Sequence, residues 1–135
     1  LARILFKPNC NFNKKNFPFF SNKISLFNSQ NTFISSKVLI DYFLFPNIGR
    51  MEDIWASYYV SSKKHRILYD EPTVFQLRNK HSLMKDFDDE YLGYKKNMEL
   101  IDALVKDPEN IHYFLPKKTS RAFEEWKKII LKYRF

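Results

Sequence analysis

The hydrophobic pattern in the middle of the chain predicts two consecutive helices. Residues 36–44 place apolar side chains at helical spacing, at Val38, Leu39, Tyr42 and Phe43. Pro46 and Gly49 then interrupt the pattern, because proline lacks an amide hydrogen and glycine favours turns. Helical spacing resumes from Arg50 to Ser62, at Met51, Ile54, Trp55, Tyr58 and Tyr59. The sequence therefore predicts a helix, a turn and a second helix with an apolar stripe.

The second half of the chain predicts short strands followed by helices. Residues 66–70 and 73–76 have the composition of extended segments, with a turn between them. Residues 83–106 predict a long amphipathic helix that Gly93 weakens in its middle. Its expected inward positions are Leu83, Phe87, Tyr91, Tyr94, Met98, Ile101 and Leu104.

A final helix is expected after the break at residues 107–108. Thr119 and Ser120 are suited to cap it, and it should run to about Lys132. Its expected inward side chains are Phe123, Trp126, Ile129 and Ile130. Residues 7–25 show no periodicity and predict an irregular segment.

The order of these elements predicts part of an α/β domain that is rich in helices and has a few short strands. Helices and strands do not alternate through the chain, so we expect the back half of such a domain, with the sheet completed by upstream strands. The first residue is Leu1 rather than Met, which favours a piece of a longer protein. Within one domain spanning residues 1–135, the pattern distinguishes an irregular segment (1–26), a motif region (27–82) and a helical region (83–135).

Composition and charge favour some partners and exclude some kinds of site. The net charge is +8, with 23 basic and 15 acidic residues, which favours an anionic partner but also suits an ordinary lysine-rich surface. The single cysteine excludes an internal disulfide and a cysteine-based zinc site. No apolar run approaches the ~20 residues that a membrane-spanning helix needs.

An acidic pair at a predicted helix start is the first candidate for chemistry. Glu52 and Asp53 follow Gly49 and Arg50, at the beginning of the helix expected over residues 50–62. A carboxylate held there at the mouth of a cleft can accept a proton from a hydroxyl group. Acidic residues are also favoured in any first helical turn, so the spacing alone leaves both interpretations open.

Two polar segments are candidates for ligand binding. Residues 28–32, Asn-Ser-Gln-Asn-Thr, offer Asn28, Gln30 and Asn31 to a polyhydroxylated ligand, or form a solvated turn. Residues 76–81 follow a predicted strand, where Arg78 suits a diphosphate and His81 suits a phosphate oxygen or a metal. His65 and His112 show no acidic or histidine partner at metal-ligand spacing.

Taken in order, these segments resemble the later part of the STELLO-like family of glycosyltransferases. The similarity covers residues 27–95: the Asn-Ser-Gln-Asn-Thr patch, an acidic-Asp-Ile-Trp run at residues 52–55, and the Gln-x-Arg-Asn-x-His loop at residues 76–81. The chain differs at Ala56 and Ser57, where the family pattern has Arg-Gly. The resemblance implies a GT-A (Rossmann-like) fold, of which this chain is the C-terminal half.

The resemblance also implies a role for each candidate residue. Asp53 matches the acceptor-side base, with Glu52 beside it. Asn28, Gln30, Asn31 and Trp55 would line the sugar site, while Arg78 and His81 would face the diphosphate or a divalent cation (Mn²⁺ or Mg²⁺). The Asp-x-Asp motif that binds the donor is expected upstream, because Asp86-Phe87-Asp88 lies within a predicted helix.

Two functions from different classes follow. The first is transfer of a sugar from a nucleotide-sugar donor to a hydroxyl acceptor, with this chain supplying the acceptor-side half and little activity alone. The alternative is a basic, non-catalytic module that binds RNA or another polyanion. The alternative requires lysines and aromatic side chains to converge on one exposed face.

Overall fold

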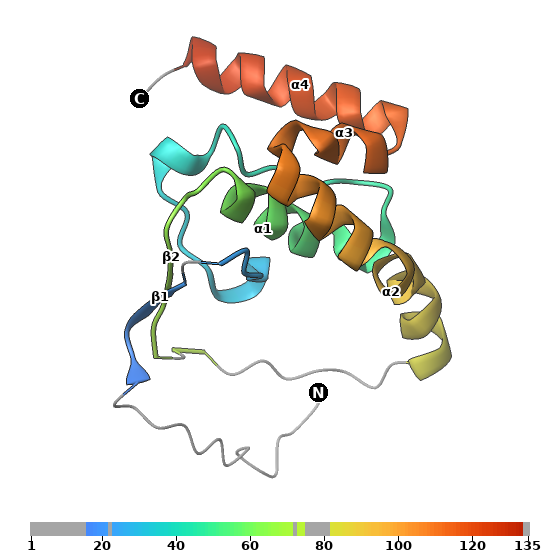
Figure 1. Cartoon of the computed structure of the whole chain (residues 1–135), viewed down its shortest axis with the longest axis horizontal. Coiled ribbons are helices and arrows are strands. Elements are labelled where there is room, and N and C mark those ends of the chain that lie inside the picture. Colours follow the sequence, from blue (N-terminus) through green and yellow to red (C-terminus); the bar gives the residue numbers. More distant parts are fainter. Residues whose placement is uncertain (1–15, 22, 72, 75–81, 134–135) are drawn as a thin grey trace, which may run out of the picture.

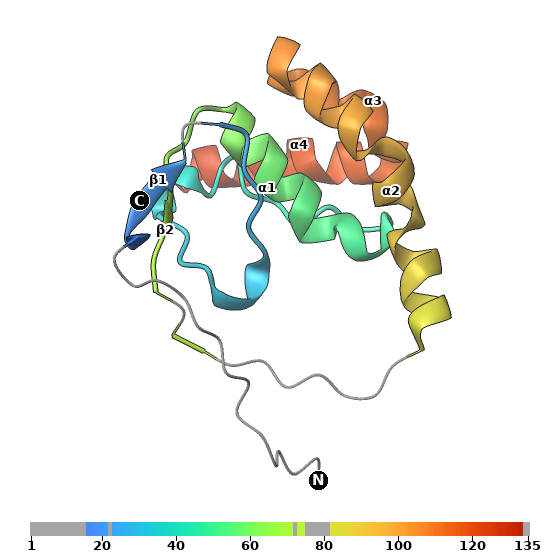
Figure 2. The same cartoon turned by 60° about the horizontal axis from the view of Figure 1, so that its bottom comes forward.

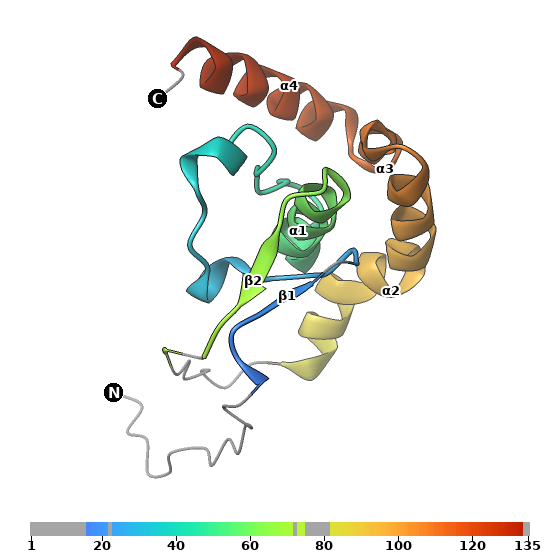
Figure 3. The same cartoon turned by 60° about the vertical axis from the view of Figure 1, so that its left-hand side comes forward.

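The computed structural model describes residues 16–21, 23–71, 73–74 and 82–133. Helices α2, α3 and α4 follow one another in an arc around α1, and the strands lie to one side (Figures 1 and 3). In chain order the elements are β1 (Phe19–Ser21), η2 (Ser29–Asn31), η3 (Ser36–Val38), η4 (Gly49–Met51), α1 (Glu52–Ser62), β2 (Ile67–Tyr69), α2 (Leu83–Lys106), η5 (Pro108–Asn110), α3 (Ile111–Phe114) and α4 (Lys117–Lys132), where η marks a 3₁₀ helix. The expected helix-rich α/β class with short strands is confirmed.

The sheet of the described residues consists of two short antiparallel strands. Phe19 pairs with Tyr69 and Ser21 with Ile67, so β1 and β2 are in continuous register. The rings of Phe19 and Tyr69 stack with centroids 5.0 Å apart, and such cross-strand aromatic pairs stabilise a small sheet. Strand β2 was predicted. Strand β1 lies in the segment expected to be irregular, which makes that expectation wrong for Phe19–Ser21.

Helix α1 and helix α2 were predicted with nearly their observed bounds. The helix expected over residues 36–44 is only the 3₁₀ turn η3 followed by turns. Of the extended segment expected over residues 73–76, residues 73 and 74 form no strand, and residues 75 and 76 lie outside the described part of the chain. None of the helices in the described ranges is both long enough and apolar enough to cross a membrane.

Helix α4 begins two residues before its expected cap. Pro116 precedes its first turn, so Thr119 lies inside the helix rather than at its start. The buried Thr119 hydroxyl donates to the Pro46 carbonyl oxygen at 2.7 Å. The Ser120 hydroxyl is instead paired with His112. Both side chains bond to other segments, so the predicted capping role is wrong.

The core is built around aromatic side chains from three segments. The Phe123 ring of α4 lies edge-to-face with Phe45 and with Tyr59 of α1, with centroids 5.1 and 5.2 Å apart. All three side chains are fully buried. Trp126 donates its indole N–H to the Leu39 carbonyl oxygen, but Ile129 is half exposed. The inward side of α4 was therefore predicted correctly for Phe123, and wrongly for Ile129.

Helix α2 is rotated relative to the prediction. Its expected inward stripe is largely in solvent, since Leu83, Phe87, Tyr91, Tyr94 and Met98 are all more than half exposed. The side that faces the protein instead carries Asp86, Glu90, Gly93, Asn97, Leu100 and Leu104. Figure 2 shows α2 running past α1 with its N-terminal half beyond the other helices. The assignment of the aromatic stripe to the core was wrong over most of the helix.

Both glycines of the chain explain this rotation. A Cβ atom at Gly93 would lie 2.3 Å from the Met51 sulfur, and one at Gly49 would lie 2.5 Å from the Asp89 carbonyl oxygen. Only residues without a side chain allow η4 and α2 to approach so closely. The sequence suggested only that Gly93 weakens α2. In the structure, Gly93 is also the place where Met51 of the η4 turn packs against the helix.

Polar groups on α2 complete the same contact. The Arg50 guanidinium lies 2.6 Å from the Asp86 carboxylate and 3.1 Å from that of Glu90. The Trp55 indole N–H donates to the Asn97 side-chain oxygen at 2.8 Å. Buried polar groups require such partners, so this pairing favours the polar side of α2 against the core. Asp86 and Glu90 are therefore partly buried in this contact, whereas Asp88 and Asp89 between them are exposed.

Replacing Gly49 by Ala should lower the free energy of unfolding by about 2–3 kcal/mol, from backbone strain and overpacking combined. Gly49 has a φ of 62° and its added methyl group would contact the Asp89 backbone. Chemical denaturation measures the change. The matched control is Lys64→Gly, which removes the Cβ atom at an exposed position with a φ of 63° and so measures the backbone strain without a contact. A loss of stability in Gly49→Ala no larger than the gain in Lys64→Gly would show that the contact with Asp89 is unimportant.

Candidate functional site

The polar patch of residues 28–32 folds around the start of α1. The Asp53 carboxylate oxygen Oδ2 accepts from the Ser29 backbone N–H at 2.9 Å and from the Ser29 hydroxyl at 3.1 Å. Within the patch, the Asn28 side chain caps the turn η2 by accepting from the Gln30 backbone N–H. The fold therefore joins two of the segments that the sequence had marked separately.

One carboxylate oxygen of Asp53 has no hydrogen-bond partner within the described part of the chain. Both bonds from Ser29 fall on Oδ2, and among the described residues Oδ1 has no protein partner. Asp53 lies in the first turn of α1, where the helix dipole favours a negative charge. Burial, and then the Asp53 charge, raise the pKa of Tyr42. The half-buried Asp53 carboxylate is thus oriented by one loop and open on its other oxygen.

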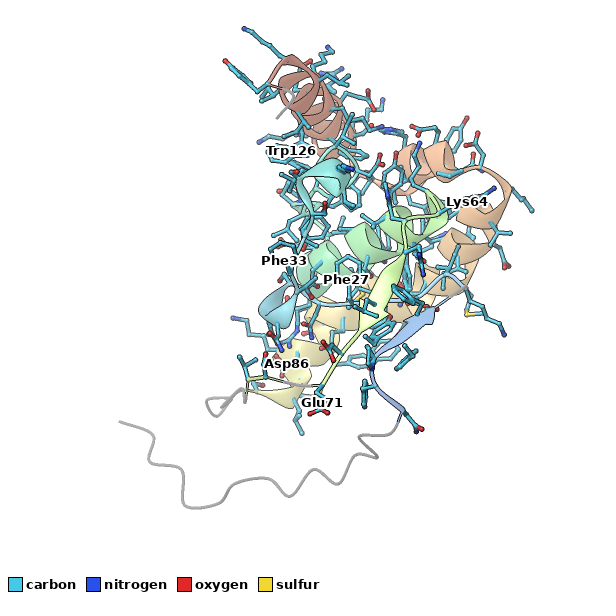
Figure 4. The ribbon with its side chains drawn as sticks, turned by 90° about the vertical axis from the view of Figure 1, so that its left-hand side faces the viewer. Phe27, Phe33, Lys64, Glu71, Asp86 and Trp126 are labelled. Carbon is cyan, nitrogen blue, oxygen red and sulfur yellow. The ribbon has the colours of Figure 1, made fainter. Side chains whose placement is uncertain are left out.

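A groove of about 720 Å³ lies beside this loop. Asn28 and Asn31 line it, together with apolar side chains such as Phe27 and Val60. Figure 4 looks onto this side of the molecule and labels Phe27, Phe33 and Glu71 from the lining. An apolar wall with a few polar groups is typical of small-molecule sites. Gln30 is next to this lining in sequence, but neither Gln30 nor Asp53 is part of it.

A histidine–aspartate pair at the groove was missed by the sequence analysis. His65 lines the groove, and its Nε2 atom lies 2.7 Å from the Asp41 carboxylate. The Asp41 carboxylate is largely buried, and it fixes the orientation of the ring. The two residues are 24 positions apart, so only the fold brings them together. An oriented imidazole can exchange a proton or a hydrogen bond with a bound ligand.

The remaining candidates are placed as follows. Glu52 is exposed at the first position of α1. Trp55 is completely buried and its indole N–H is used by Asn97, so in this structure it supports the core rather than a ligand. Arg78 and His81 lie outside the described residues. The expectation that His81 binds a metal therefore stays a prediction.

A second charged cluster joins four helical segments. Glu109 of η5 accepts from the Tyr59 hydroxyl at 3.0 Å and from the Lys63 ammonium at 3.3 Å. The Lys127 ammonium of α4 lies 3.3 Å from the other Glu109 oxygen and 3.2 Å from the Glu124 carboxylate. His112 lies 2.9 Å from that same Glu124 oxygen. The sequence analysis did not predict either acidic partner of His112, which are Glu109, three residues earlier, and the more distant Glu124.

The pKa of Glu109 reflects this cluster. Burial opposes ionisation of its carboxyl group, but the Lys127 charge and the hydrogen bonds from Tyr59, Lys63 and Lys127 outweigh it, so the pKa lies below its usual 4.5. Conversely, burial and the Glu109 charge raise the pKa of the Tyr59 hydroxyl. The cluster therefore favours a charged Glu109 next to a neutral Tyr59.

Among the described residues, one group of three has the geometry of a metal site: Glu109, His112 and Glu124, whose ligand atoms lie within 4.8 Å of one another. The Lys127 ammonium already contacts both carboxylates, and the His112 Nδ1 atom is paired with Ser120. A divalent cation would therefore face an existing positive charge. The group fits an ionic network better than a metal, and none of its members lines the groove.

The comparisons with known proteins add no family. The chain matches no family model, and neither the curated proteins nor the solved structures contain a match to it. The site is therefore interpreted from its own geometry.

Replacing Glu109 by Gln should lower the free energy of unfolding at neutral pH by roughly 0.5–1 kcal/mol, a modest effect because the carboxylate is half exposed to solvent. The lowered pKa of Glu109 means that its ionic contribution is present above about pH 4.5 and is lost as the pH falls through the folded-state value. The stability difference between wild type and variant should therefore shrink on acidification. Thermal melts across this range provide the measurement.

Glu125→Gln is the matched control for this experiment. Glu125 pairs with Lys128 on the exposed side of α4, where an ion pair contributes little. The control should change stability by less than the Glu109 variant at neutral pH. A difference between wild type and the Glu109 variant that stays constant as the pH falls would contradict the role assigned to the charge.

Proposed function

We propose that the chain is the acceptor-side part of a nucleotide-sugar-dependent glycosyltransferase with a GT-A fold. The observation that carries the proposal is the oriented Asp53 carboxylate, bonded through Oδ2 to Ser29 and open at Oδ1. The resemblance to the STELLO-like family assigns the acceptor-side base to this same residue. The adjacent groove, with Asn28 and Asn31 in its lining, is of the size that small ligands occupy.

In this proposal Asp53 accepts the proton of the acceptor hydroxyl. The hydroxyl oxygen forms a bond to the anomeric carbon of the donor sugar while the bond from that carbon to the diphosphate breaks. Asp53 lies in the first turn of α1, and a base of this kind must be close enough to the acceptor hydroxyl to take its proton. Asn28 and Asn31 offer amide groups to sugar hydroxyls, and Glu52 is exposed close to the base.

The donor is proposed to be bound elsewhere in a longer polypeptide. The diphosphate, with an accompanying Mn²⁺ or Mg²⁺, is assigned by resemblance to an upstream Asp-x-Asp motif, with Arg78 and His81 facing it. The cation would balance the charge on the leaving diphosphate. The contribution proposed for the described residues is restricted to the acceptor and its proton.

The alternative, a module that binds RNA or another polyanion, has less support. The largest aromatic side chains of the core, including Trp55, Tyr59 and Phe123, are fully buried. Arg50, Lys63 and Lys127 are each engaged by acidic side chains. These three basic groups are therefore already paired, while exposed aromatic side chains among the described residues include Phe87, Tyr91 and Tyr94 of α2. Binding to a single-stranded RNA with a strong salt dependence would favour the alternative.

Asp53→Asn should lower kcat for sugar transfer by about 10²–10⁴-fold with a small change in KM, because the amide keeps the hydrogen bonds but cannot accept a proton. The assay uses the full-length polypeptide that contains this chain, a panel of sugar nucleotides and added Mn²⁺. Asp102→Asn, at an exposed position of α2, is the control and should retain wild-type kcat. Full turnover by the Asp53 variant would rule out its assignment as the base.

A further inference from the structure

Helix α2 has two separate lengthwise stripes, and among the described residues only one of them packs against the rest of the protein over its full length. The buried stripe follows residues 86, 90, 93, 97, 100 and 104 and packs against η4, α1 and the core. The other stripe repeats every seven residues on a neighbouring side. It consists of Met84, Tyr91, Met98 and Val105 at one heptad position and Phe87, Tyr94 and Ile101 three residues later.

This second stripe, here called the outer seam, has the pattern of a helix-pairing surface. Apolar residues at positions a and d over three heptads are typical of coiled coils. All members of the outer seam except Ile101 are at least half exposed. At 100° per residue, the centres of the two stripes point about 110° apart, so a partner helix on the outer seam would not displace the core.

The outer seam is a continuous apolar surface. Its six exposed members, three of them aromatic, are each at least half exposed along three heptads of the helix. Large contiguous apolar patches are uncommon on monomers. Phe87 already stacks on Tyr94, with centroids 5.8 Å apart, so part of the surface is preorganised.

The charges beside the outer seam suit a second copy in the opposite direction. Asp88 and Lys95 occupy successive e positions, and both are exposed. When two copies of α2 pair antiparallel with Tyr91 facing the partner's Tyr94, Phe87 faces the partner's Met98. Asp88 then lies opposite the partner's Lys95, and the two-fold axis repeats each contact. In this register the apolar positions face apolar positions and the two charges face opposite charges.

We propose that the chain forms a symmetric homodimer through the outer seams of two antiparallel α2 helices. The dimer contact is separate from the groove beside the 28–32 patch, since no residue of α2 lines that groove. Met98 is suited to the ring of the partner's Phe87, because methionine sulfur contacts aromatic edges favourably.

Sedimentation velocity across a micromolar concentration series tests the dimer. Wild type should pass from monomer to dimer, and Tyr91→Lys should weaken the dimer by at least about tenfold, because the substitution places two charges in the centre of the contact. Tyr113→Lys is the matched control, since Tyr113 is 86% exposed and lies on α3 outside the outer seam. Circular dichroism confirms that both variants remain folded. A wild type that stays monomeric, or equal effects of the two variants, would overturn the proposal.

A charge exchange tests the antiparallel direction. Asp88→Lys and Lys95→Asp should each weaken the dimer, because each places like charges opposite one another. The double variant should recover most of the affinity, since it restores both pairs with their signs reversed. Weakening in the double variant that equals the sum of the single effects would exclude this register. Seam residues protected from hydrogen exchange in a monomeric full-length polypeptide would identify another occupant and would also overturn the dimer.

Discussion

The close contact between the η4 turn and α2 is the constraint on which the rest of the structure depends. Gly49 rests on the Asp89 backbone, and Gly93 leaves room for the Met51 side chain, so each glycine gives the space that one half of the contact needs. The contact aligns Arg50 with Asp86 and Glu90 and brings the Trp55 indole to Asn97. Since η4 leads directly into α1, this contact also fixes the direction of α1. It thereby fixes the position of Asp53 in the first turn of that helix.

The same contact separates the two surfaces to which we assign roles. Turning Gly93 and Asn97 inward leaves the aromatic seam of α2 in solvent, available to a second copy. The 28–32 loop approaches the start of α1 through the Ser29–Asp53 bonds and borders the groove. The η4–α2 contact therefore leaves the outer seam exposed, and the start of α1 positions Asp53, the candidate base.

Charged groups secure the opposite end of the core. Glu109, His112, Glu124 and Lys127 connect η5, α3 and α4 to Tyr59 and Lys63 of α1 above the buried Phe123 ring. The Lys63 and Lys127 ammonium groups pair with the Glu109 and Glu124 carboxylates, so ion pairs connect these helical segments.

Local sequence was enough to predict α1, β2, α2 and the C-terminal end of α4, because periodicity, acidic first turns and the proline at position 108 act within a few residues. It also marked Asp53 and the 28–32 patch, although their direct bond links positions 24 residues apart. Only the tertiary structure decided the rotation of α2, the pairing of β1 with β2, the Trp55–Asn97 hydrogen bond and the Asp41–His65 pair. Each of these features depends on partners that are distant in sequence. In α2, close packing at Gly93 and hydrogen bonds to distant residues outweigh the preference of the apolar stripe for the core.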